Sequence, residues 1–285
     1  MLKLLWLLGM VAVAQGEDMA AGERQVVLEQ DLQAGGTHWR IATKNGPIHV
    51  WRPDDIHQRG AGTVIFLHGY FTDVDNAWQE YRLAEQFAAS NRNAIFIAPE
   101  APNGDEQEPF WSSLKNLVAC VFREIRVKPP NGPLVAAGHS GAFRTLVTWL
   151  ENPFLREILL LDGLYRHEDK FARWLWTKGI RHRKMILVAV DTFERTEELV
   201  SKFPRTAVAR VGLPEEASGF SLSERKARLL YLRAENVDHM GLITQGKVLP
   251  LALQLTTIED LPLPTIDLAT NVTPGSDPPP GTRSN

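Results

Sequence analysis

The chain has 285 residues, of which 44% are hydrophobic and 23% are charged, and its formal net charge at pH 7 is −3. This composition is typical of a soluble globular protein, and the length fits one large α/β domain or two small ones. Because the chain is weakly acidic and has no block of basic residues, we expect neither nucleic acid nor an anionic membrane as a partner. The single cysteine, Cys120, excludes an intrachain disulfide and a zinc–thiolate cluster.

Residues 1–16 have the features of a secretory signal peptide. Lys3 supplies a short basic start, an apolar run follows from Leu4 to Ala14, and small residues suited to cleavage end the segment. The apolar run is too short to span a bilayer comfortably. We therefore expect cleavage and export, to the periplasm or to the outside of the cell, without a stable membrane anchor.

The pattern of apolar residues after this segment predicts antiparallel strands followed by a buried parallel sheet. The first strand candidates are residues 24–30 and 37–42, in which polar and apolar residues alternate. Asn45–Gly46 then predicts a hairpin turn, and residues 47–52 are the returning strand. The later candidates are apolar throughout, as in a sheet covered on both faces, and cover residues 63–67, 94–98, 134–137, 157–161, 185–190 and 228–232. Helical segments are expected between them, at residues 78–90, 112–127, 142–151, 167–177 and 196–203.

Strands and helices that alternate in this way predict an α/β fold. We expect a three-layer α/β/α sandwich with a mostly parallel twisted sheet and antiparallel N-terminal edge strands, at residues 24–268. The stretch between Leu161 and Met185 has room for one helix, so we expect little or no lid. Residues 269–285 are rich in proline and poor in apolar side chains, which predicts a disordered tail.

The pentapeptide Gly-His-Ser-Gly-Ala at residues 138–142 lies between a predicted strand and a predicted helix. A serine between small residues at such a turn presents its hydroxyl as a nucleophile, and the pattern is G-x-S-x-G with alanine in place of the last glycine. The turn also aims the backbone N–H of Gly141 at the position where an oxyanion forms. The sequence therefore predicts Ser140 as the nucleophile and Gly141 as an oxyanion donor.

Two more loops are expected at the same edge of the sheet, beyond the carboxyl ends of its strands. His239 follows the last predicted strand, and we expect it to act as the base for Ser140. The turn at residues 67–71 contains a His-Gly pair and is expected to supply the second oxyanion donor, the backbone N–H of Tyr70. His68 competes with His239 for the role of base, but its place in the His-Gly pair indicates that it shapes the turn.

Two aspartates compete for the role of the acid that orients the histidine. Asp191 follows the predicted strand that ends at Val190, and Asp162 follows the one that ends at Leu161. We favour Asp191, because the chain order serine, aspartate, histidine with the acid one strand before the histidine is the commoner layout. Asp162 is the alternative acid.

Aromatic residues near these motifs are candidates for a substrate-binding pocket. We select Trp78 and Trp111 for this role, although packing of loops over the core explains each of them equally well. The sequence has no His-Glu-x-x-His metal motif and neither the dinucleotide-binding nor the phosphate-loop glycine pattern. We therefore expect no metal and no cofactor.

These motifs together resemble an α/β-hydrolase of the serine esterase type, over about residues 24–250. The residues that carry the resemblance are Trp111 and the segments 67–70, 97–102, 137–142, 190–191 and 238–241. The resemblance implies hydrolysis of an ester or related acyl bond through an acyl-enzyme on Ser140. Ala142 and the lack of Asp-x-x-Val-Pro around the acid depart from the family pattern. A peptidase or amidase with the same triad, and a non-catalytic binding protein on the same fold, remain open alternatives.

Overall fold

The computed structural model describes residues 26–177, 180 and 182–262. The expected signal peptide at residues 1–16 and the expected tail at residues 269–285 lie outside the described residues. None of the described helices combines the length and the apolar character needed to traverse a bilayer.

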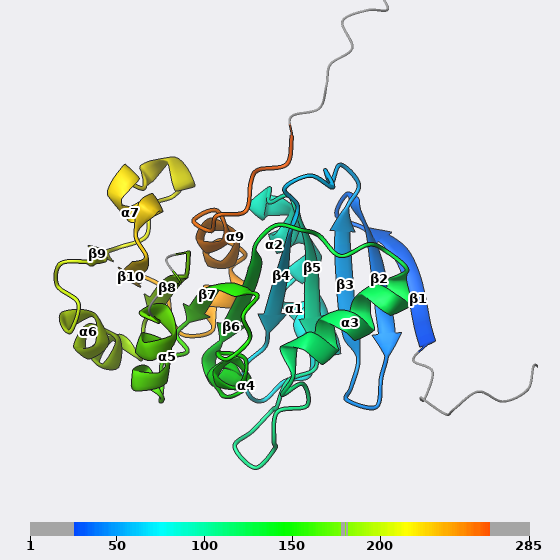
Figure 1. The fold of residues 1–285 in the computed structure, drawn as a ribbon, viewed down its shortest axis with the longest axis horizontal. Coiled ribbons are helices and arrows are strands. Elements are labelled where there is room, and N and C mark those ends of the chain that lie inside the picture. The colour runs from blue at the N-terminus through cyan, green and yellow to red at the C-terminus, as the bar shows by residue number, and fades with distance from the viewer. Residues whose placement is uncertain (1–25, 178–179, 181, 263–285) are drawn as a thin grey trace, which may run out of the picture.

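The described strands form one ten-stranded sheet in the order β1-β2-β3-β5-β4-β6-β7-β8-β10-β9 (Figure 1). The pairs from β1 to β5 are antiparallel and all pairs from β5 to β9 in this order are parallel, so the predicted antiparallel N-terminal edge is present. The strand bounds are β1 (Val26–Gln33), β2 (Gly36–Ala42), β3 (Ile48–Pro53), β4 (Gly62–Leu67), β5 (Ala94–Pro99), β6 (Leu134–His139), β7 (Leu155–Leu161), β8 (Lys184–Ala189), β9 (Ala207–Val211) and β10 (Leu229–Arg233).

Helices cover both faces of the sheet, which gives the predicted three layers. The bounds are α1 (Val74–Glu80), α2 (Leu83–Ser90), α3 (Leu114–Ile125), α4 (Phe143–Thr148), α5 (Glu168–Leu175), α6 (Phe193–Ser201), α7 (Leu222–Lys226), α8 (Gly241–Thr244) and α9 (Val248–Leu253), with short 3₁₀ helices η1 (Ser140–Ala142) and η2 (Ala217–Gly219). Helices α3 to α6 pack in one hydrophobic core, and α1, α2, α8 and α9 pack in a second core on the opposite face.

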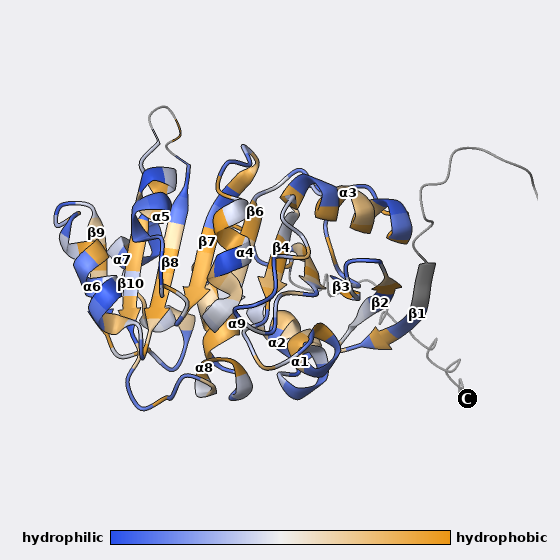
Figure 2. Ribbon diagram, turned by 90° about the horizontal axis from the view of Figure 1, so that it is seen from below, coloured by the Kyte–Doolittle hydropathy of each residue, from blue (hydrophilic) through white to orange (hydrophobic). Residues whose placement is uncertain are grey.

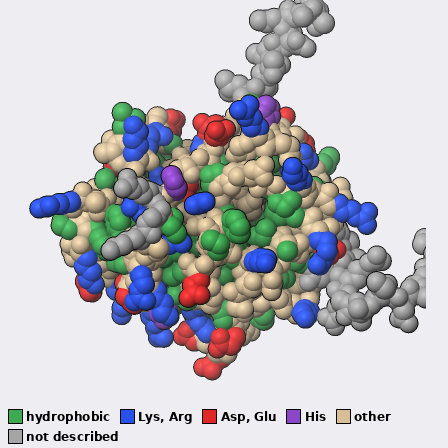
Figure 3. All heavy atoms as spheres, in the orientation of Figure 1, with side chains coloured by type: hydrophobic (Ala, Val, Ile, Leu, Met, Phe, Trp, Pro, Cys, Tyr) green, Lys and Arg blue, Asp and Glu red, His purple; other side chains and the backbone are tan. Residues whose placement is uncertain are grey.

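Strand β4 shows why the central strands are apolar throughout. Its side chains alternate between the two cores, with Ile65 and Leu67 in the first and Val64 and Phe66 in the second. Figure 2 shows the same feature for the central strands, which are mostly hydrophobic along their length, whereas many helices have a hydrophilic side. On the face turned to the viewer in Figure 3, charges of both signs are spread around the outline and apolar side chains lie nearer the middle.

The structure differs from the predicted elements in two ways, by one divided helix and by four elements that were not predicted. Arg82 has a left-handed backbone (φ 51°), which divides the predicted helix at residues 78–90 into α1 and α2. Strand β9 and helices α7 to α9 were not predicted, because β9 is a short edge strand of partly exposed residues and α9 contains Pro250. Between β7 and β8 the described residues form α5 and short connections, which agrees with the expected lack of a large lid.

Candidate active site

The turn between β6 and α4 holds Ser140 in a strained backbone conformation. Its φ of 54° lies in the left-handed region, which residues other than glycine rarely adopt. Small neighbours make this turn possible: a Cβ at position 138 would lie 2.8 Å from the Cβ of Ala142. Alanine is therefore tolerated at position 142 because position 138 is glycine, and the departure from G-x-S-x-G leaves the turn intact.

The backbone N–H groups predicted as oxyanion donors lie beside this serine. The position that a Cβ would occupy on Gly69 is 2.9 Å from the Ser140 Cβ, and a Cβ on Gly141 would overlap the Tyr70 ring. The Tyr70 N–H has no hydrogen-bond acceptor among the described residues, whereas the next N–H, that of Phe71, donates to the Asn103 carbonyl at 2.9 Å. The N–H of Gly141 belongs to the first turn of a helix, where such groups lack an intrahelical acceptor.

A cavity of ≈300 Å³ opens at this turn. Ser140, Gly141 and Tyr70 line it together with residues that the sequence analysis did not select: Asp105, Phe143, Tyr165, Arg166 and Arg195. The three predicted residues are thus brought together at one concave surface.

The side chain of His239 is held by Asp162. Its Nδ1 lies 2.7 Å from Asp162 Oδ2, and the Asp162 side chain is fully buried. The hydrogen bond that His239 donates to Asp162 raises the pKa of His239 above its ordinary value, despite the opposing effect of burial. Because His239 follows β10 and Asp162 follows β7, the pair joins two loops at the carboxyl edge of the sheet.

The Asp162 carboxylate accepts hydrogen bonds at both of its oxygens. Oδ1 accepts from the backbone N–H groups of Val190 and Thr192 and from the Thr192 hydroxyl, and Oδ2 accepts from the Asp191 N–H and from His239. Burial alone would raise the pKa of Asp162, but these hydrogen bonds outweigh it and hold the pKa far below its ordinary value. Asp162 is therefore ionised and oriented before any substrate binds.

The geometry corrects our preference for Asp191 as the acid. Asp191 Oδ2 is 3.9 Å from His239 Nδ1, beyond hydrogen-bonding distance, and its side chain is 65% exposed. The Asp191 backbone N–H donates to Asp162 instead, at 3.0 Å. A solvated carboxylate without a hydrogen bond does not fix a ring, so Asp162 is the better candidate.

Asp162, Asp191 and His239 are close enough together to be considered as metal ligands, since their ligand atoms all lie within 4.8 Å of one another. However, the oxygens of Asp162 already accept five hydrogen bonds, and one of these uses His239 Nδ1. A carboxylate has about four lone-pair sites, so none is left for a metal ion. The donor set therefore fits a hydrogen-bond network and not a metal centre.

Tyr165 is a site residue that the sequence analysis missed. It lines the cavity together with Ser140, and its ring centroid lies 6.5 Å from that of His239. Burial, followed by the charges of Asp162 and Asp191, raises the pKa of Tyr165 to about 12, so the phenol is neutral. Among the described residues Ser140 and His239 share no direct hydrogen bond, and the Tyr165 ring lies beside His239 at the cavity that Ser140 lines. Catalytic hydrogen bonds of this kind often tighten only when substrate binds.

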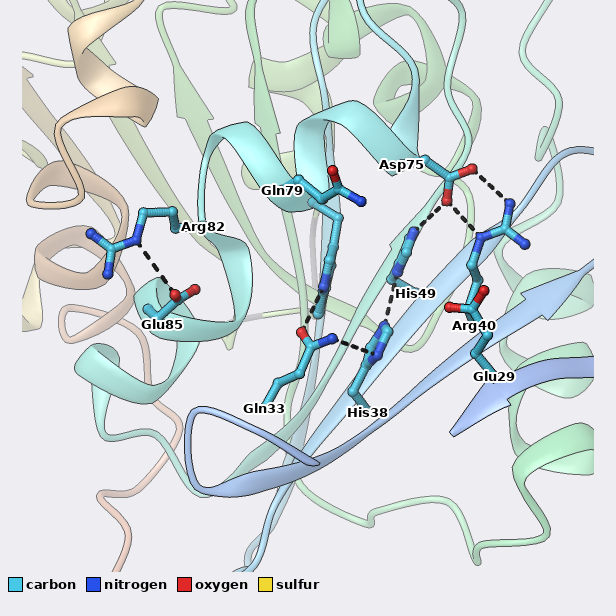
Figure 4. A pocket seen from close by; sticks show the side chains of 10 residues that line it. Glu29, Gln33, His38, Arg40, His49, Asp75, Gln79, Arg82 and Glu85 are labelled. Carbon is cyan, nitrogen blue, oxygen red and sulfur yellow. Dashed lines mark hydrogen bonds and ion pairs between the residues drawn. The ribbon is translucent and has the colours of Figure 1, made fainter. Parts of the chain in front are cut away.

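Trp78 lies away from the serine, against the antiparallel edge of the sheet. It lines a different pocket, of ≈650 Å³, in which His38 and His49 form a line between Gln33 and Asp75 (Figure 4). The Trp78 ring stacks on both imidazoles, at centroid distances of 4.8 and 4.7 Å, and its Nε1 donates to Gln33. The expectation that Trp78 binds substrate is not met by this position.

Trp111 is also a packing residue. Its side chain is buried in the first core, and its carbonyl accepts a hydrogen bond from Trp149 Nε1 at 2.7 Å. It does not line the cavity at Ser140. His68 has the turn-shaping role expected of it, since its Nδ1 lies 2.7 Å from the Gly69 carbonyl and its Nε2 lies 2.9 Å from Glu100.

Comparison with known proteins supports the fold. No protein-family model and no curated protein matches the chain. Among solved structures, the chain is similar to the feruloyl esterase module from Clostridium thermocellum, solved as a serine-to-alanine mutant complexed with sinapinate. The two are 12% identical, the match covers 77% of this chain and 89% of that one, and the TM-score is 0.56.

Two further structures are similar. For a protein named FAE the identity is 11%, the coverage is 81% of this chain and 89% of that one, and the TM-score is 0.52. For an S-formylglutathione hydrolase from Agrobacterium tumefaciens the identity is 12%, the coverage is 81% and 98%, and the TM-score is 0.49. At these identities the similarity concerns the fold. Together with the sheet order and the serine turn, the similarity to the first two structures, whose TM-scores exceed 0.5, confirms the predicted α/β-hydrolase fold.

Proposed function

We propose that this chain, with its α/β-hydrolase fold, is a serine hydrolase that cleaves an ester or related acyl bond through an acyl-enzyme on Ser140. The observation that carries the proposal is the left-handed serine at the end of β6, beside two backbone N–H groups and near a histidine bonded to a buried aspartate. The ester class is supported by similarity of fold to the feruloyl esterase module, at low sequence identity.

In the proposed mechanism Ser140 Oγ attacks the acyl carbon while His239 Nε2 takes the hydroxyl proton. The N–H groups of Tyr70 and Gly141 donate to the oxygen that becomes negative, an interaction worth on the order of 100- to 1000-fold in rate for each donor. His239 then passes the proton to the leaving group. Water, activated by His239 in the same way, attacks the acyl-enzyme and releases the carboxylic acid and free Ser140. Asp162 keeps Nδ1 of His239 protonated and stabilises the imidazolium that forms at each step.

The proposal is tested by reacting the purified chain with a fluorophosphonate probe and by following hydrolysis of p-nitrophenyl acetate. We expect the probe to label Ser140 and the label to be lost in Ser140→Ala. His239→Ala should lose both labelling and hydrolysis while remaining folded, as circular dichroism checks. A wild-type chain that takes up no probe, or a Ser140→Ala variant that is labelled equally, contradicts the proposal.

Export is a second, separate part of the proposal, and it is supported only by the signal-peptide features of residues 1–16. Expression of the full chain in an export-competent bacterial host, followed by mass spectrometry of its N-terminus, tests this part. We expect the chain to begin after Ala14 or Gly16 in the exported fraction. An intact N-terminus on protein that stays in the cytoplasm contradicts it.

A further inference from the structure

The residue before the nucleophile, His139, is buried between the catalytic elements. It ends β6, and only 1% of its surface is exposed. Its Nε2 lies 3.0 Å from the backbone carbonyl oxygen of His239, and the two imidazole centroids are 4.6 Å apart. His139 thus connects the strand that carries Ser140 to the loop that carries His239.

The hydrogen-bond partners of the His139 ring fix its tautomer. A carbonyl oxygen only accepts hydrogen bonds, so Nε2 must carry the proton that is donated to His239. Nδ1 is buried and has no hydrogen-bond partner among the described residues, and a Cβ on Gly69 would be only 3.2 Å from it. A second ring proton at Nδ1 would therefore be buried without an acceptor, which is costly.

The charged and titratable groups around His139 are His239 on the loop after β10, Asp162 after β7 and His68 after β4. The two histidines favour a neutral ring, whereas the Asp162 carboxylate favours the charged form. Burial, followed by the neighbouring His239, lowers the pKa of His139 to about 4. His239 is therefore the imidazole of the adjacent pair that gains a proton near neutral pH.

We propose that His139 is a positioning residue, which holds the backbone of the His239 loop against the end of β6 through a neutral Nε2–H. Asp162 fixes the ring of His239, and His139 fixes its backbone. A neutral donor suits this place because a charged ring would oppose protonation of His239 during the reaction. The catalytic part of this inference rests on the proposed function, whereas the contact between strand and loop does not.

The test compares two amide side chains of different length. His139→Gln can place its terminal N–H near the position of Nε2, whereas the amide of His139→Asn ends near the position of Nδ1. Hydrogen–deuterium exchange of the 234–240 segment measures whether the loop is held. We expect faster exchange in His139→Asn and in the ring-keeping variant His139→Phe, and wild-type exchange in His139→Gln.

The kinetic readout separates positioning from substrate binding. A misplacement of about 1 Å costs on the order of 100-fold in rate, so we expect kcat to fall by about that factor in His139→Phe and His139→Asn. KM should stay unchanged because His139 does not line the cavity at Ser140. His139→Gln should recover most of the lost kcat and keep the wild-type pH profile.

Loop exchange that is identical in wild type, His139→Phe and His139→Asn overturns the proposal, whatever the rates. Rates that fall equally in His139→Gln and His139→Asn overturn the claim that the Nε2–H donor matters. Failure of the wild type to react with the fluorophosphonate probe refutes the proposed hydrolase. The exchange measurement still decides the contact between His139 and the His239 loop in that case.

Discussion

Replacing each of the two candidate acids by asparagine should have very different effects on turnover. Asp162→Asn keeps the shape of the side chain but removes the acceptor that holds His239 Nδ1–H at 2.7 Å. An amide at this place favours the wrong tautomer of the histidine, and in serine triads that change costs on the order of 10,000-fold in kcat. We expect a loss of that order for Asp162→Asn.

The expected loss for Asp191→Asn follows from its distance and exposure. Two unit charges 3.9 Å apart interact by about 1 kcal/mol in water, and mobile salt reduces this further. Since Asp191 is 65% exposed, the value in water applies, and it corresponds to a factor of about five in rate. The backbone N–H of residue 191 still donates to Asp162 in this variant.

The assay is steady-state hydrolysis of p-nitrophenyl acetate by both variants at pH 8, with fluorophosphonate labelling as a second measure of serine reactivity. Thermal unfolding controls for damage to the fold, since Asp162→Asn also perturbs hydrogen bonds to residues 190–192. If Asp191→Asn loses far more activity than Asp162→Asn, the reasoning from distance and burial is refuted.

Three further predictions follow from the surroundings of single side chains. The pKa of His239 is raised by Asp162, so kcat/KM of the wild type should fall with decreasing pH through a midpoint above 6.5, and this midpoint should move to lower pH in Asp162→Asn. Because Trp78 is buried, Trp78→Ala should lower the unfolding free energy by roughly 3–5 kcal/mol in denaturant titrations. Because Trp78 does not line the cavity at Ser140, kcat/KM should stay unchanged, and a large loss of kcat/KM in the folded variant would assign Trp78 to the substrate pocket after all. Burial lowers the pKa of His49 to about 4, so the stability from keeping it neutral is present above pH 6.5 and is lost as pH falls toward 4; urea titrations should show a shallower decline over this range in His49→Phe, and an equal decline would contradict the assignment.

Much of the fold was predictable because its central strands are buried on both faces. Such strands appear in sequence as short apolar runs, and β4 to β8 with β10 were found in this way. The same logic placed Ser140 and His239 at one edge of the sheet. It failed for β9, whose partly exposed residues resemble a loop, and for the break at Arg82, which depends on a single backbone torsion.

The choice of acid could not be made from the sequence for a similar reason. Asp162 and Asp191 both follow strands, and chain order alone favoured Asp191. In the structure Asp162 adopts a left-handed backbone (φ 47°), and its carboxylate meets the N–H groups of residues 190–192. Aspartate tolerates this conformation better than most residues, but no pattern in the sequence predicts a left-handed backbone at position 162. Trp78 and Trp111 were misassigned because closeness to a motif in sequence says little about which way a ring points.

The close approach of β6 and α4 leaves room for one methyl group between positions 138 and 142. The chain carries that methyl on Ala142, and a second one on position 138 would be 2.8 Å away from it and also 2.8 Å from Leu146 Cδ1. The two positions therefore form a coupled pair in which an exchange, glycine for alanine and alanine for glycine, is tolerated better than Gly138→Ala alone. The constraint is an upper limit of one methyl group at these two positions, and both G-x-S-x-G and G-x-S-x-A stay within it.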